Sequence, residues 1–372
     1  MGDSIERHRI TQRVGDTELH LPRLGIGCAN LGELWESISA TDAITTLINA
    51  ANTHGISYFD TAPWYGNGCS EIRLGVAAHE MASNGKSKIQ ISTKVGKFLD
   101  PMPKDDGVGP WVGGCNLRIR PDYSYNGVMQ QHRESCLRLG SPFVQTLVIH
   151  DLDSHHLGNQ TEQHLTQLLD KQNGGLRALL ELKTSKKIQA IGIGCNSFEW
   201  GSLETCKRVF EMARAFELEN KGFPKALDFV LCAGDFNLLT QKALDELIPL
   251  CEKFKISLVI GAAYGGNGAI LARGVKSQSV MNKDFKFLYE KAPSEIIKKV
   301  EAIEDICEKH DVTLGAAALQ FPLRHPMVKS VLAGVKCEEE VNLAVKYMNE
   351  DIPEAFWDEL KASKNIRDVN GK

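Results

Sequence analysis

Short apolar segments alternate with longer amphipathic segments along most of the chain. Eight of the apolar segments are rich in β-branched residues and bounded by turn-forming residues, a pattern typical of parallel strands buried on both faces. We expect strands at Leu24–Cys28, Ser57–Asp60, Ile89–Lys94, Gln145–His150, Gln189–Cys195, Asp228–Cys232, Ser257–Gly261 and Val328–Ala333. The segments between them have helical periodicity; over residues 295–310, for example, apolar residues form one stripe.

Strands and helices in this alternation favour a (β/α)8 TIM barrel of the α/β class over an open doubly wound sheet. Residues 7–21 contain a turn at 14–16 and are expected to form an N-terminal hairpin that closes the barrel floor. Residues 95–122 and 262–292 are expected to be long irregular loops over the catalytic mouth. The chain has no linker or low-complexity tract, so one barrel domain is expected over residues 1–372.

Polar residues follow the predicted strands at the end where barrels of this type carry out chemistry. Asp60 and Lys94 each end a strand, and His150 ends a third. Tyr65 follows Asp60 in the next turn. A tyrosine titrates near pH ~10 in water, and a neighbouring ammonium favours its phenolate. A lysine held by an aspartate would therefore let Tyr65 exchange a proton with an alcohol or a carbonyl.

In the same arrangement His150 would hydrogen bond to the reacting oxygen. None of these side chains can store a hydride, so a nicotinamide cofactor is implied. Each residue taken alone also has a structural interpretation, as a cap, a surface charge or a packing residue. Their occurrence in order at successive strand ends favours the catalytic interpretation.

Residues 60–75, which contain Asp60 and Tyr65, resemble the first signature of the aldo-keto reductase family. Lys94 and His150 fall where that family has its lysine and histidine, and the resemblance covers nearly the whole chain. Four further segments are similar to the aldose 1-dehydrogenase branch, which includes L-fucose, D-arabinose and L-galactose dehydrogenases and pyridoxal 4-dehydrogenases. These segments are residues 122–129, 138–140, 150–153 and 233–239.

This resemblance implies NAD(P)-dependent oxidation at C1 of a free aldose, in its cyclic hemiacetal form, to a lactone. Tyr65 would be the general acid/base. Pyridoxal also closes to an internal hemiacetal, so a pyridoxal 4-dehydrogenase is an alternative. Two further hypotheses remain open, namely an NADPH-dependent aldehyde reductase and a barrel that binds nucleotide as a sensor or partner subunit without turnover.

The cofactor contacts follow from the same resemblance. Asn196 would bind the nicotinamide carboxamide, and Tyr264 would stack on the ring. Gly334 and Lys336 precede a predicted helix suited to a phosphate, although a solvated lysine explains Lys336 equally well. Where NADP-selective members often carry an arginine, this chain has Glu340, whose carboxylate would repel a 2′-phosphate. We therefore expect NAD, with NADP as the alternative.

Aromatic residues are candidates for the substrate wall. Trp64 adjoins Tyr65 of the predicted catalytic tetrad, which consists of Asp60, Tyr65, Lys94 and His150. Trp111 and Tyr125 lie in or after the first long loop. Ordinary loop packing explains Trp111 equally well. Histidines and aspartates are dense over residues 150–156 and could hold a divalent metal. Such clusters are common by chance, however, and His150 already has a role, so no metal is expected.

Composition excludes several classes of partner. The net charge is −4 and no basic segment stands out, so neither nucleic acid nor an anionic membrane is an expected partner. The ten cysteines include no Cys-x-x-Cys pair, and the first residues have no apolar signal core. We therefore expect reduced thiols and a cytoplasmic enzyme with a small-molecule substrate. No sequence feature indicates an oligomeric state.

Overall fold

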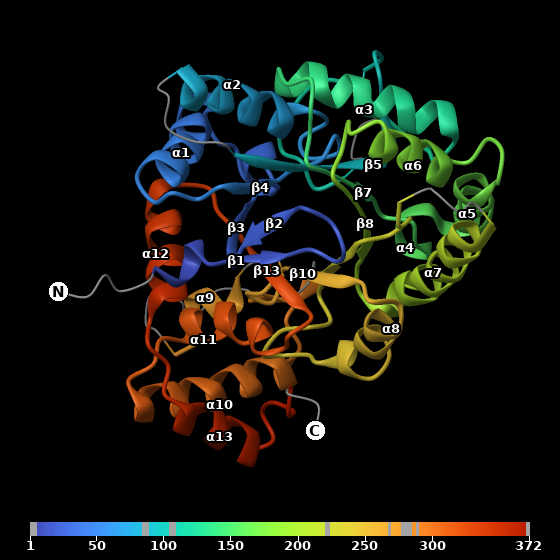
Figure 1. Cartoon of the computed structure of the whole chain (residues 1–372). Helices are drawn as coiled ribbons and strands as arrows, with labels where there is room; N and C mark the ends of the chain where they lie inside the picture. Colours follow the sequence, from blue (N-terminus) through green and yellow to red (C-terminus); the bar gives the residue numbers. More distant parts are fainter. Residues whose placement is uncertain are drawn as a thin grey trace.

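The computed structural model describes residues 6–83, 89–103, 109–219, 224–266, 269–276, 285–287 and 290–369. Within these residues eight parallel strands close into a barrel in the order β4-β3-β13-β10-β9-β8-β7-β5, and β5 pairs with β4 (Figure 1). The strands are β3 (Leu24–Gly27), β4 (Tyr58–Asp60), β5 (Gln90–Asp100), β7 (Thr146–Ile149), β8 (Ala190–Cys195), β9 (Phe229–Ala233), β10 (Ser257–Gly261) and β13 (Val328–Gly334). The predicted barrel and its strands are confirmed.

Helices surround the barrel (Figure 1). They are α1 (Ala40–Asn52), α2 (Cys69–Ser83), α3 (Tyr125–Leu139), α4 (Ser154–Leu157), α5 (Thr161–Leu169), α6 (Gly175–Thr184), α7 (Ser202–Glu219), α8 (Leu247–Phe254), α9 (Ile270–Arg273), α10 (Ser294–His310), α11 (Leu314–Gln320), α12 (Glu338–Asn349) and α13 (Glu354–Ala362). Local sequence sets their ends. For example, the Ser39 hydroxyl accepts a hydrogen bond from the Asp42 amide and caps α1.

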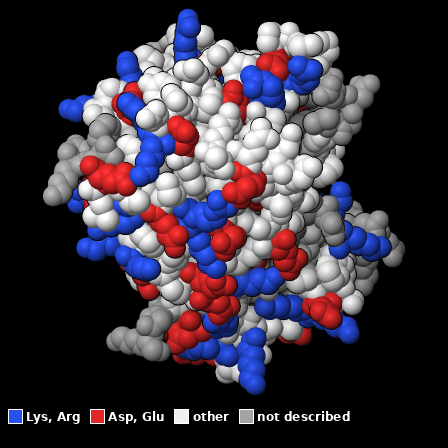
Figure 2. Space-filling view, turned by 90° about the vertical axis from the view of Figure 1, so that its right-hand side faces the viewer, with Lys and Arg blue, Asp and Glu red and all other residues white. Residues whose placement is uncertain are grey.

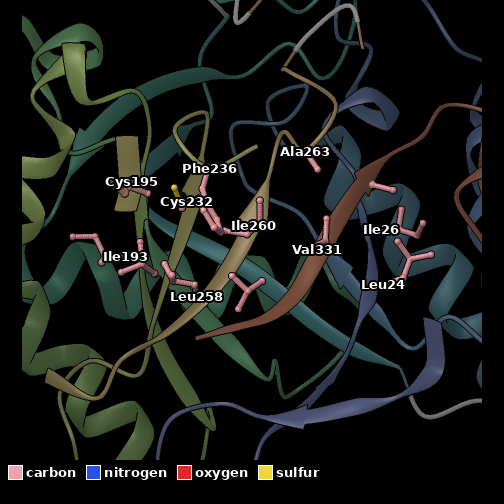
Figure 3. Close-up of a cluster of buried hydrophobic side chains, with 14 of the residues drawn as sticks. Leu24, Ile26, Ile193, Cys195, Cys232, Phe236, Leu258, Ile260, Ala263 and Val331 are labelled. Atoms are coloured by element: carbon pink, nitrogen blue, oxygen red, sulfur yellow. The ribbon is translucent and has the colours of Figure 1, made fainter. Parts of the chain in front are cut away.

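The strands are buried on both faces, which explains their continuous apolar sequences. In β10, Leu258 and Ile260 belong to the core between the barrel and its helices, whereas Val259 packs with Phe229 in a second cluster. Figure 3 shows the first cluster. Its labelled members are Leu24, Ile26, Ile193, Cys195, Cys232, Phe236, Leu258, Ile260, Ala263 and Val331.

The predicted N-terminal hairpin is present and closes the barrel floor. Strands β1 (Thr11–Arg13) and β2 (His20–Pro22) pair antiparallel. Val14 and Leu21 are fully buried in the same cluster as Phe229. The amide of Gly15 donates to the hydroxyl of Ser257, the first residue of β10, at 2.8 Å. The hairpin therefore covers the amino-terminal ends of the strands, opposite the end at which chemistry is expected.

The sequence suggested that the whole segment after Lys94 is irregular, but part of it is a regular β-hairpin. Strand β5 continues beyond the barrel to Asp100 and pairs antiparallel with β6 (Arg118–Asp122). Gly96 has a φ of 113°, and a Cβ there would meet the Tyr123 ring at 2.2 Å, so glycine is required where the strand leaves the barrel. The second segment contains α9 and the short strands β11 (Lys286–Phe287) and β12 (Glu290–Lys291). Residues 104–108, 267–268, 277–284 and 288–289 of the two segments lie outside the described part of the chain.

Charges of both signs are interspersed over the face shown in Figure 2. Surface ion pairs join neighbouring helices: Arg208 of α7 pairs with Glu162 of α5 at 2.5 Å, and Lys171 pairs with Glu219 of α7 at 2.8 Å. Of the helices in the described ranges, none is both long enough and apolar enough to cross a bilayer.

Candidate active site

The carboxyl ends of β4, β5 and β7, which are neighbours in the barrel, hold a buried lysine–aspartate pair. The Lys94 ammonium lies 2.6 Å from Oδ2 of Asp60 and donates to the Thr61 carbonyl at 2.7 Å. The side chains of Lys94 and Asp60 are only 1% and 3% exposed. Because burial of a lone charge is costly, each of these ions depends on the other to remain charged inside the barrel.

Tyr65 lies over this pair in the turn between β4 and α2. Its amide donates to the Ala62 carbonyl at 3.1 Å, and its own carbonyl accepts from the Ser70 amide at 3.1 Å. The Lys94 nitrogen is 4.7 Å from the centre of the Tyr65 ring, and the His150 ring is 5.8 Å from it, centre to centre. The structure thus brings all four predicted tetrad residues together.

His150 follows β7 and is buried. Burial lowers its pKa well below the ordinary value, and the ammonium groups of Lys94 and Lys97 lower it further, against the opposing effect of Asp151. The imidazole is therefore neutral at neutral pH. The backbone carbonyl of His150 accepts a hydrogen bond from the Tyr123 hydroxyl at 2.6 Å, while the buried Nδ1 has no partner among the described residues. One nitrogen of the ring is therefore left without a hydrogen bond inside the protein.

A second buried ion pair, which the sequence did not reveal, adjoins the tetrad. The Lys97 nitrogen is 2.9 Å from Oδ2 of Asp151 and 3.5 Å from the centre of a Trp64 ring. Burial acts to raise the pKa of Asp151, but His150, Lys97, His156 and a hydrogen bond from Asn196 outweigh it and hold that pKa well below its usual range. Asp151 therefore stays ionised.

The sequence signal for Lys97 was weak because residues three apart in a regular strand point to opposite faces. Lys94 and Lys97 would then lie on different sides of β5. Gly96, with its positive φ, interrupts this regularity at the point where β5 leaves the barrel. In the sequence, only the presence of Gly96 and Lys97 close to a predicted strand end could have indicated that Lys97 belongs to the site.

Asn196 lies directly after β8 and is held by two carboxylates. Its Nδ2 donates to Oδ1 of Asp151 and to Oδ2 of Asp153, both at 2.9 Å. The other Asp153 oxygen lies 2.8 Å from Nδ1 of His156. Ligand atoms of Asp151, Asp153 and His156 approach within 4.8 Å of one another, as in a metal site. The Lys97 ammonium pairs with Asp151 and the Asn196 amide donates to both carboxylates, so the group is a hydrogen-bonded network.

Two of the three predicted wall residues lie beside the tetrad. The rings of Trp64 and Trp111 meet at 88° with centres 5.7 Å apart, and the centre of Trp111 is 5.8 Å from that of Tyr65. Tyr125 is not brought to this cluster. It begins α3, and its hydroxyl donates to Glu181 of α6 at 2.6 Å. Tyr123, two residues earlier, is the tyrosine that contacts the site.

Glycines stand at or next to the carboxyl ends of four barrel strands. Gly27, Gly194, Gly261 and Gly334 end or nearly end β3, β8, β10 and β13, and all four are at least partly exposed. A Cβ at any of them would meet no atom closer than 3.3 Å. The backbone is therefore accessible at the end of the barrel that carries Asp60 and His150.

Helix α12 begins shortly after β13. The Glu340 carboxylate accepts a hydrogen bond from the Lys336 amide at 2.9 Å, and the Lys336 ammonium lies 2.5 Å from Glu36. Tyr264 follows β10 and is half-buried, and burial raises its pKa, with smaller contributions from Tyr347 and Glu340. The predicted cofactor residues thus follow or end β8, β10 and β13, and Lys336 is already paired to an acidic side chain.

Comparisons with known proteins agree with this geometry. The profile of the aldo/keto reductase family matches residues 23–365. A pyridoxal 4-dehydrogenase from Microbacterium luteolum is 36% identical over 359 residues, which are 94% of this chain and 96% of that protein. A D-threo-aldose 1-dehydrogenase from a Pseudomonas species is 30% identical over 353 residues, with coverages of 94% and 95%. The solved structure of a glycerol dehydrogenase from Gluconobacter oxydans, 18% identical, matches the fold with a TM-score of 0.67 over 97% of this chain and 98% of that one.

Replacing Lys97 with methionine should lower the free energy of unfolding by on the order of 3–5 kcal/mol, because Asp151 would be left as a buried charge without its cation. Urea unfolding followed by circular dichroism measures the change. The matched control is Lys171→Met, whose pair with Glu219 is 58% and 51% exposed. This substitution should lower the free energy of unfolding by less than about 1 kcal/mol. Equal losses in the two variants would contradict the structural role of Lys97.

The ring of His150 should stay neutral at pH 7, because burial and two neighbouring ammonium groups all disfavour the imidazolium. On acidification it should take up a proton only well below the usual histidine value of about 6.5. Nitrogen-15 NMR of the histidine rings reports the charge directly, and a His150→Gln variant assigns the resonance. A positively charged His150 at pH 7 would show this account of the site to be wrong.

Proposed function

This chain belongs to the aldo/keto reductase family, and we propose that it oxidises the hemiacetal carbon of a cyclic substrate to a lactone, with NAD as the hydride acceptor. The observation that carries the proposal is the Lys94–Asp60 pair beneath Tyr65, beside a neutral His150. Two relatives support the class of substrate. They are named as dehydrogenases of pyridoxal and of D-threo-aldoses, and both kinds of compound close to internal hemiacetals.

In this proposal Tyr65 is the general acid/base that transfers the proton. The Lys94 ammonium, fixed by Asp60, favours the phenolate form and lets Tyr65 accept the proton of the hemiacetal hydroxyl. The neutral His150 ring hydrogen bonds to the same oxygen and fixes its position. A bound nicotinamide supplies the hydride acceptor that none of these side chains provides.

A dinucleotide is proposed to lie across the strand ends beside the tetrad. The four terminal glycines would let such a ligand approach the backbone closely. Asn196, held by Asp151 and Asp153, would bind the carboxamide with its remaining oxygen, and Tyr264 would stack on the ring. Gly334 would leave room for the phosphates.

NAD is favoured over NADP by the charge at the start of α12. The Glu340 carboxylate accepts from the Lys336 amide just before this helix, and the Lys336 ammonium is already paired with Glu36. Neither residue therefore offers a free cation to a 2′-phosphate. A phosphate placed near Glu340 would be repelled. The same argument disfavours the NADPH-dependent aldehyde reductase.

The substrate is proposed to be a free aldose or pyridoxal. The perpendicular rings of Trp64 and Trp111 can cover a sugar or a pyridine ring beside Tyr65. Pyridoxal is the second candidate because the relative that is 36% identical carries that activity in its name. The shared step in both cases is removal of a hydride from a hemiacetal carbon.

Tyr65→Phe should lower kcat by about 10²–10⁴-fold, because the phenylalanine ring retains the packing but has no proton to exchange. Binding of NADH, followed by fluorescence titration, should change little. The control is Tyr125→Phe, which loses only the bond to Glu181 and should keep wild-type activity. Substantial turnover by Tyr65→Phe would exclude the acid–base assignment.

The substrate class is tested by following reduced nicotinamide formation with NAD and with NADP. L-fucose, D-arabinose, L-galactose and pyridoxal are the substrates to compare. We expect oxidation of at least one of them with NAD and a lower kcat/KM with NADP, because of Glu340. Reduction of simple aldehydes by NADPH, with no oxidation of any of the four, would contradict the proposal and favour a general reductase.

A further inference from the structure

Two cysteines that are distant in sequence lie on the same turn of backbone, next to Tyr65. Cys69 begins α2, and Cys115 belongs to the segment that carries Trp111. Both of their amides donate to the Gly66 carbonyl oxygen, at 3.1 Å from Cys69 and 2.9 Å from Cys115. Two amides that share one acceptor must lie close together, so the fold holds this pair side by side.

The contact between the two segments is tight. Gly114 has a φ of 86°, and a Cβ there would meet the Gly66 oxygen at 2.4 Å. A Cβ on Gly66 would in turn meet the Cβ of Cys69 at 3.0 Å. The backbone around Cys115 is therefore packed closely against the turn that holds Cys69.

The two thiols are chemically different. They interact as hydrogen-bonding partners, with Cys69 as the donor; this bond, helped by Arg138 and Arg73, lowers the pKa of Cys115 to about 7 against the effect of burial. The same bond, together with burial, raises the pKa of Cys69. Cys115 is thus partly thiolate at neutral pH, which is the reactive form of cysteine.

Both cysteines are also accessible, unlike most others in the chain. Each is half-buried, whereas six cysteines are fully buried, namely Cys28, Cys195, Cys206, Cys232, Cys251 and Cys307. The remaining half-buried residues, Cys136 and Cys337, have pKa values raised by burial. A reactive thiolate with an adjacent second thiol therefore occurs at this one place among the ten cysteines.

We propose that Cys69 and Cys115 form a reversible oxidation site for peroxides. The Cys115 thiolate attacks the O–O bond of hydrogen peroxide, becomes a sulfenic acid and releases hydroxide, which takes up a proton to give water. The Cys69 sulfur then loses its proton, attacks the sulfenic sulfur and expels the second hydroxide, which becomes water. Two thiols are oxidised to one disulfide, and one peroxide is reduced to two waters.

The cross-link would join the wall of the active site to its catalytic turn. Trp111, four residues before Cys115, contacts the Tyr65 ring, and Tyr65 directly precedes Gly66. Oxidation would fix the Trp111 segment against that turn. The site differs from the proton-transfer chemistry proposed above and does not depend on the identity of the substrate.

The test is to treat the reduced, folded full-length protein with hydrogen peroxide, block the remaining thiols by alkylation and map the peptides by mass spectrometry. We expect a disulfide-linked peptide that joins Cys69 to Cys115 and that dithiothreitol removes. The melting temperature should rise by several degrees, since a cross-link restricts the unfolded chain. In the reduced protein at pH 7, Cys115 should alkylate at least about tenfold faster than Cys136.

Variants separate the two steps. In Cys69→Ser, oxidation should stop at a sulfenic acid on Cys115, which dimedone traps. Cys115→Ser should form neither the sulfenic acid nor the disulfide. Cys136→Ser is the matched control and should oxidise like the unaltered chain. The proposal is overturned if no Cys69–Cys115 peptide forms, or if Cys69→Ser and Cys115→Ser both leave the peroxide-dependent rise in melting temperature unchanged.

Discussion

The buried pair between Lys94 and Asp60 is the interaction on which the rest of the site depends. Two charges are held 2.6 Å apart on neighbouring barrel strands, and either one alone would be an uncompensated buried charge. The pair fixes an ammonium group 4.7 Å from the centre of the Tyr65 ring. A parallel barrel supplies this geometry directly, because the carboxyl ends of β4 and β5 are adjacent and open at the same face.

A second lysine–carboxylate pair, Lys97 with Asp151, extends the same principle around His150. The two ammonium groups add to burial in lowering the pKa of His150, so the ring is neutral and not a cation at neutral pH. Asp151 in turn holds Asn196. The roles proposed for His150 and Asn196 therefore depend on the same buried charges. Loss of Lys97 would disturb both.

The barrel, its hairpin and the convergence of the tetrad could be predicted from sequence because each depends on local pattern and strand order. Apolar runs locate the strands, and parallel topology places Asp60, Lys94 and His150 together. Lys97 was missed because its position depends on the backbone irregularity at Gly96. Tyr125 was expected near the tetrad because the register of the α3 start, which directs Tyr125 to Glu181, cannot be read from composition. Cys69 and Cys115 are far apart in the sequence, so the sequence does not reveal that their amides share one acceptor oxygen.

The most direct measurement of the central claim follows deuterium from the hemiacetal carbon. An accepted aldose, or pyridoxal, carrying deuterium on that carbon is incubated with NAD, and both products are analysed by NMR. The account predicts deuterium in the reduced nicotinamide, none in the solvent, and a lactone in equal amount. Deuterium that stays on the substrate carbon, or a product other than the lactone, would contradict oxidation at that position by this site.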